Sequence, residues 1–175
     1  DPERLQMSGA VTGPDIAAGF YGKFPARGDF VRVGLPHAFT DPWDRWMSAS
    51  VADSKARLGD QWLPIYLESP VWRFELAAGV CGQTEVVGLF LPSVDRVGRY
   101  FPLTFAALGP ADDDWLAACE DAGFAALEQE IGPDDIAARI GLPIGLRDRD
   151  DAPSVVGGTL WWTDGSPRVP ATRFE

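Results

Sequence analysis

Alternating apolar and polar residues along the chain predict a series of short strands. In one segment, Trp72, Phe74 and Leu76 occupy every second position with charged residues between them. This is the period of a strand with one buried face. Segments of extended character, bounded by Gly, Pro and polar residues, predict strands at residues 19–24, 71–77, 85–91, 100–108 and 159–163.

Other segments show the period of an amphipathic helix. Asp41 and Pro42 are typical of a helix start, because Asp accepts hydrogen bonds from free N–H groups and Pro suits the first helical position. We expect a helix over residues 42–58 whose buried face is formed by Trp43, Trp46, Met47, Val51 and Leu58. A second helix is expected after Pro110, with Asp112, Asp113 and Asp114 at its positive N-terminal end, and a third over residues 133–140. The apolar stripe of the second helix is formed by Leu116, Cys119, Gly123, Leu127 and Ile131.

The predicted elements follow the order β-α-β-β-β-α-α-β. Short connections between successive strands favour antiparallel pairing. Trp161 and Trp162 are neighbours in the last strand and must face opposite sides of a sheet, so both sides need a cover. We therefore expect one α/β domain with a mixed, largely antiparallel sheet and helices packed on both faces, an α/β/α sandwich.

The ends of the chain and one internal segment lack such patterns. Residues 1–12 are predicted to form a flexible N-terminal segment, and residues 13–175 to form the domain. The residues before Met7 are interpreted as an addition ahead of a natural start. Residues 146–158 are predicted to form a loop.

The 175-residue chain holds 26 acidic and 15 basic residues, a net charge of −11. This charge has the wrong sign to attract nucleic acid or an anionic lipid surface, so neither partner is expected. With no long apolar run and no leader pattern, we expect a cytoplasmic protein without membrane insertion. Fourteen acidic but only five basic residues follow residue 108. That asymmetry indicates either a surface for a basic partner or solvated helix faces.

Few residues offer catalytic or metal-binding chemistry. Cys81 and Cys119 lie far apart and His37 is the only histidine, so metal-ligand spacing and a redox motif are both lacking. Glycine-rich nucleotide loops are also lacking, and we expect no metal and no cofactor. A triad of Ser93, Asp95 and His37 is disfavoured, because no nucleophile-elbow pattern accompanies the serine.

Two predicted loops carry clusters of polar residues between apolar ones. The candidates for partner binding or loop organisation are Lys23, Arg27, Asp29, Ser93, Asp95, Arg96 and Arg99. Ion pairs among them can hold the two loops against each other, or the same side chains can contact a partner. Acid–base catalysis is a weaker third interpretation, because a carboxylate paired with arginine stays ionised.

Several motifs occur in an order that matches a known family. They are GFYGKFPARGDF at residues 19–30, GLP at 34–36, DPWDRW at 41–46, SPVWRF at 69–74, GVCG at 79–82 and PSVDRVGRYFPLT at 92–104. In these motifs the chain resembles the TagF (ImpM) family of bacterial type VI secretion accessory proteins. The resemblance is strong over residues 19–108 and looser as far as residue 163.

This resemblance implies an α/β sandwich and a cytoplasmic, non-enzymatic protein that represses secretion after translation. It also implies a forkhead-associated scaffold protein as the partner and a link to the threonine kinase and phosphatase pathway of that system. No catalytic residues carry over from the family. Two alternatives stay open at this point: a hydrolase that uses Asp29 or Asp95, and a structural subunit of the secretion apparatus.

Overall fold

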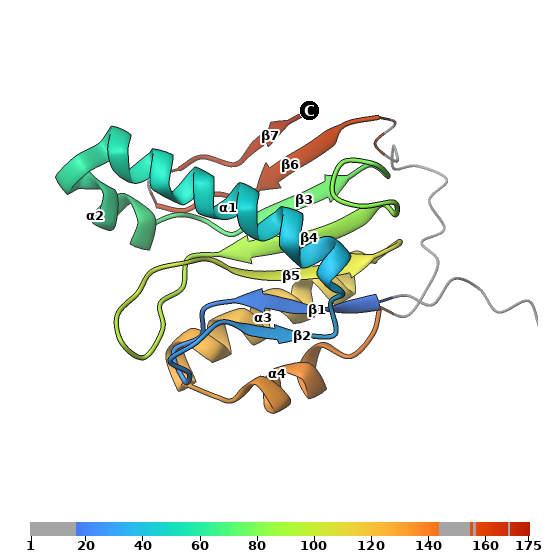
Figure 1. Cartoon of the computed structure of the whole chain (residues 1–175), viewed down its shortest axis with the longest axis horizontal. Coiled ribbons are helices and arrows are strands. Elements are labelled where there is room, and N and C mark those ends of the chain that lie inside the picture. The colour runs from blue at the N-terminus through green and yellow to red at the C-terminus, as the bar shows by residue number, and fades with distance from the viewer. Residues whose placement is uncertain (1–16, 144–154, 156, 168) are drawn as a thin grey trace, which may run out of the picture.

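The computed structural model describes residues 17–143, 155, 157–167 and 169–175. In this part of the chain, seven strands form one sheet in the order β2-β1-β5-β4-β3-β6-β7, and every neighbouring pair is antiparallel (Figure 1). The strands are β1 (Ala17–Gly22), β2 (Val31–Val33), β3 (Trp72–Leu76), β4 (Val86–Leu91), β5 (Leu103–Leu108), β6 (Thr159–Thr163) and β7 (Thr172–Phe174). The predicted single α/β domain with a largely antiparallel sheet is confirmed.

The helices are α1 (His37–Leu58), α2 (Trp62–Leu67), α3 (Asp113–Gln129) and α4 (Pro133–Ile140), with a short 3-10 turn at Gly59–Gln61. Helix α3 begins where its acidic residues predict, and the Asp112 side chain accepts a hydrogen bond from the Trp115 N–H at 2.7 Å. The predicted range of α4 is also correct. The expected segment 1–12 and most of the expected loop 146–158 lie outside the described residues.

Two apolar clusters form the core, and alternate residues of the central strands divide between them. Val86 and Ala106 pack with α1, whereas the adjacent Val87 and Ala107 belong to the cluster that contains α3 and α4. In Figure 1, α1 lies in front of the sheet, α3 passes behind the strands, and α4 lies below β2. Successive side chains of a strand point to opposite faces of the sheet, so those of β4 and β5 divide between the two clusters.

Helix α1 begins at His37, before the predicted start, so Asp41 is not its cap and Pro42 lies inside the helix. The Pro36 carbonyl accepts hydrogen bonds from the Phe39 and Thr40 N–H groups, both at 3.0 Å. Phe39 is buried in the core. Burial of this extra turn offsets the one hydrogen bond that Pro42 cannot donate.

The predicted buried face of α1 is partly wrong. Trp43 and Met47 are buried, but Trp46 and Leu58 are 44% and 38% exposed. Trp46 stacks at the margin of the core, 5.4 Å from the Trp161 ring. Leu58 ends the helix where it extends past the sheet toward α2 (Figure 1).

Three elements were not predicted: β2, β7 and α2. The two strands have three residues each, which is too short to show alternation. Strand β5 begins at Leu103 rather than at residue 100, because Pro102 cannot donate to a sheet. Tyr100 instead forms an isolated bridge with Val94. Among the described helices, none is long and apolar enough to cross a bilayer.

Glu130, which ends α3, has a left-handed backbone conformation (φ 50°) that is costly for a residue with a Cβ. We expect Glu130→Gly to raise the free energy of unfolding by about 1 kcal/mol, measured by urea denaturation. The control is Glu128→Gly inside the same helix, which should lower it by about 1 kcal/mol. Equal losses in both variants would contradict this account.

Candidate functional site

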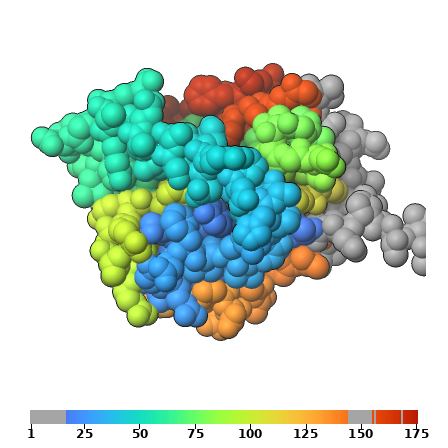
Figure 2. All heavy atoms as spheres, viewed as in Figure 1, coloured from blue at the N-terminus to red at the C-terminus, as the bar shows by residue number. Residues whose placement is uncertain are grey.

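The two loops singled out by the sequence lie side by side. Residues 23–30 connect β1 to β2 and residues 92–102 connect β4 to β5. Figure 2 shows the two segments in contact on the surface, in blue and yellow-green. The Arg96 N–H donates to the Arg27 carbonyl at 2.9 Å, and the Arg96 guanidinium donates to the Ala26 carbonyl at 2.7 Å.

Beneath these contacts Lys23 and Asp95 are buried, and together with the exposed Arg99 they form an ion cluster, called here the Asp95 cluster. The Lys23 Nζ and the Arg99 Nε both donate to Asp95 Oδ2, at 2.8 and 2.7 Å. Asp95 Oδ1 accepts from the Val97 and Arg99 N–H groups at 3.1 and 2.9 Å. Both carboxylate oxygens are therefore satisfied, and one buried side chain binds both loops together.

This environment sets the protonation state of Asp95. Burial alone raises the pKa of its carboxyl, but hydrogen bonds from Lys23 and from the backbone and side chain of Arg99 lower it. The net result is a pKa well below the usual range for aspartate. Asp95 is thus held ionised and is poorly suited to exchange protons at neutral pH.

Ser93 links this arrangement to α2. Its Oγ donates to the Lys23 carbonyl at 2.8 Å, joining the two loops a second time. The Tyr66 hydroxyl donates to the Ser93 carbonyl at 2.8 Å and accepts from the Ser93 N–H at 2.9 Å. Burial raises the pKa of Tyr66, so its hydroxyl keeps the proton that it donates. Sequence analysis missed Tyr66, because α2 itself was not predicted.

The other sequence candidates lie outside the Asp95 cluster. Arg27, Asp29 and Arg96 are exposed and line a shallow polar depression on the loops. The disfavoured triad is not assembled in this structure, because the His37 ring contacts Asp41 at 3.2 Å while Ser93 bonds to Lys23. Among the described residues, no group of three or more His, Cys, Asp or Glu side chains could hold a metal ion.

Both cysteines are free and buried. Burial raises the pKa of the Cys81 and Cys119 thiols. A protonated, buried thiol is a poor nucleophile.

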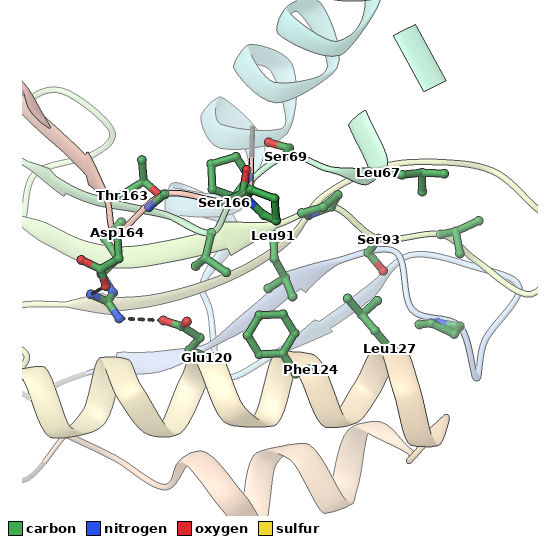
Figure 3. Close-up of a pocket in the computed structure, with 18 of the residues that line it drawn as sticks. Leu67, Ser69, Leu91, Ser93, Glu120, Phe124, Leu127, Thr163, Asp164 and Ser166 are labelled. Carbon is green, nitrogen blue, oxygen red and sulfur yellow. Dashed lines mark hydrogen bonds and ion pairs between the residues drawn. The ribbon is translucent and has the colours of Figure 1, made fainter. Parts of the chain in front are cut away.

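A cleft of about 600 Å³ borders the loops and is called here the α3 cleft (Figure 3). Phe124 and Leu127 extend from α3 toward Leu91 of β4, and Leu67 at the end of α2 lies across the opening. The lining also includes Pro25, Ser93 and Val94 from the two loops, and residues 163–167 at the end of β6 and in the turn after it. The cleft thus collects residues from five parts of the chain.

Arg73 of β3 lies at one end of the cleft. Its guanidinium donates to Glu120 at 2.6 Å and to Asp164 at 2.8 Å. The alternation in β3 indicates that Arg73 and Glu75 face solvent, yet Arg73 is half-buried and Glu75 is buried. Sequence analysis did not predict that Arg73 pairs with Glu120 and Asp164. The signal that could have indicated it is the presence of two charged residues, Arg73 and Glu75, in the otherwise apolar strand β3.

The comparisons with known proteins agree with this fold. A family model described as TagF N-terminal domain, Type VI secretion system-associated, matches residues 19–140. The chain is also similar to the crystal structure of PA0076 from Pseudomonas aeruginosa PAO1, with 36% identity and a TM-score of 0.80. That alignment covers 90% of this chain and 86% of the other. No curated protein matches the chain.

These matches define a protein associated with type VI secretion. The chain belongs to the TagF N-terminal domain family, and the resemblance seen in its motifs is confirmed.

The buried Lys23–Asp95 pair predicts a large effect of removing the lysine charge. Lys23→Met should lower the free energy of unfolding by about 3 kcal/mol, because it leaves a buried carboxylate with one fewer partner. Lys55→Met, at an exposed lysine on α1, serves as the control and should change it by less than about 1 kcal/mol. Similar unfolding midpoints for both variants would contradict the assigned role.

The lowered pKa of Asp95 also predicts a pH dependence. Its ionised form stabilises the folded state fully above the unfolded-state pKa of about 4, and this stabilisation is lost as the pH falls below that value. Between about pH 5 and pH 3, the wild type should therefore lose more stability than Asp95→Asn. Asp29→Asn, which removes an exposed carboxylate from the facing loop, is the matched control. Parallel acid unfolding curves for the wild type and Asp95→Asn would contradict the prediction.

Proposed function

We propose that the protein is a non-enzymatic accessory protein of the type VI secretion system and acts after translation as a negative regulator. It does so in the cytoplasm, by binding the forkhead-associated scaffold protein of that system. The family match over residues 19–140 supports the association with secretion. The regulatory role, the partner and the link to the threonine kinase and phosphatase pathway are what the family resemblance implies.

One observation supports a binding role over a hydrolase. Asp95, the buried carboxylate of the loop site, has both oxygens occupied by Lys23, Arg99 and backbone N–H groups. Such a carboxylate organises loops but neither attacks a substrate nor transfers a proton. The exposed Arg27, Asp29 and Arg96 are then available to contact a partner protein.

The proposal includes the three-layer arrangement expected from the sequence, an α/β/α sandwich. Its support is the pair of separate core clusters, one formed with α1 and the other with α3 and α4. In that arrangement the loops and the α3 cleft lie on rigid elements, which favours recognition with little rearrangement.

The proposal is tested by a calorimetric titration of the purified chain with the host's forkhead-associated protein, together with a deletion in the host. We expect a saturable complex in the titration and increased type VI secretion in the deletion strain. No binding by folded protein, together with unchanged secretion, would overturn the proposal.

The Asp95→Asn variant distinguishes the regulator from the hydrolase. If the carboxylate acts only by organising the loops, any loss of repression in the host should accompany a lower melting temperature. Lost repression with an unchanged melting temperature would instead favour the enzyme.

A further inference from the structure

We propose that the α3 cleft is the docking site for an apolar segment of the partner protein that carries lysine or arginine side chains. This inference rests on the proposed function. It names the surface of this protein that binds the partner and the chemistry of the partner segment that binds there.

The first support is the apolar lining of the cleft. Leu67 and Phe124 are 56% and 42% exposed at its opening, and Leu91 is buried behind them (Figure 3). A large aromatic residue that stays exposed beside a pocket is typical of a protein interface. A cleft of this size falls within the range of roughly 300–1,000 Å³ that accommodates ligands, and it can receive a few apolar side chains of a peptide.

The second support is the charge around the cleft. Among the residues that the structure describes, Glu120, Glu130 and Asp164 line it, and Arg73 is the one basic residue of the lining. Arg73 is already paired with Glu120 and Asp164. Glu130 is exposed and forms no ion pair within the described part of the chain. The cleft therefore carries surplus negative charge, which is complementary to lysine or arginine.

The third support is a pair of polar atoms without partners. Arg73 Nε and Ser166 Oγ are buried and form no hydrogen bond with the described residues. Both line the cleft. The Arg73 Nε–H is a donor, and the Ser166 hydroxyl can donate as well, so a peptide carbonyl would satisfy either group once neighbouring side chains move aside to expose it. An extended peptide segment supplies such carbonyl groups at regular intervals.

The same charge argues against a second copy of the chain as the occupant. Each copy carries a net charge of −11, so two acidic surfaces would have to approach each other at the cleft. A basic segment of another protein meets no such repulsion.

The test is a calorimetric titration of the host's forkhead-associated protein into the wild type and three cleft variants, at low and at high salt. Leu67→Ala and Phe124→Ala should each weaken binding about tenfold or more. Glu130→Lys should weaken it strongly at low salt and less at high salt.

Two matched variants are the controls. Leu63→Ala removes a leucine from the same helix as Leu67, and Glu128→Lys reverses a charge two positions from Glu130; neither residue lines the cleft. Both should bind like the wild type. Melting curves for all variants separate lost binding from lost folding, and the surface substitution Glu130→Lys keeps the test valid if an apolar variant unfolds.

Three results would overturn the inference. If the wild type binds and the cleft variants bind equally well, the inference is overturned but the proposed function stands. No binding by folded wild type would overturn both. Sedimentation that shows a dimer of the free chain, dissociated by Leu67→Ala, would assign the cleft to a second copy instead.

Discussion

The structure around the candidate site depends on the buried carboxylate of Asp95. A charge in this position is costly unless it is paired, and Lys23 and Arg99 supply the pairing from two loops that are distant in the sequence. Because Lys23 and Arg99 must both stay in contact with Asp95, each loop has one favourable conformation. Ser93 and Tyr66 then fix the end of α2 to the same place, so that one electrostatic constraint positions three segments.

These segments form one wall of the α3 cleft, and the opposite wall is helical. Gly123 lets α3 approach the sheet closely, since a Cβ there would lie 2.9 Å from the Leu91 side chain. The neighbouring Phe124 is consequently held beside the sheet yet remains partly exposed. We therefore expect the shape and charge of this surface to determine what the protein binds. The role of the Asp95 cluster is to hold the surface in place.

The sequence predicts those features that depend on local pattern. Alternation locates β3, and an extended apolar run locates β4. The acidic start of α3 and the Pro at the start of α4 define both helices. Local pattern does not place α1 correctly, because the burial of Phe39 outweighs the start signal at Asp41. The polar loop residues were identified, but their division into a buried set and an exposed set depends on how the loops meet. The α3 cleft could not be predicted, because β3, α3 and the turn after β6 converge only in the folded chain.

The most direct test of the account is hydrogen–deuterium exchange of the protein with and without the forkhead-associated protein that we propose as its partner. Local opening governs exchange, so a docked segment should slow it where the segment lies. The account predicts slower exchange in residues 67–71, 120–131 and 163–167, with unchanged exchange along the exposed side of α1. Protection confined to α1 or to the edge strand β7, or no change anywhere at saturating partner, would contradict it.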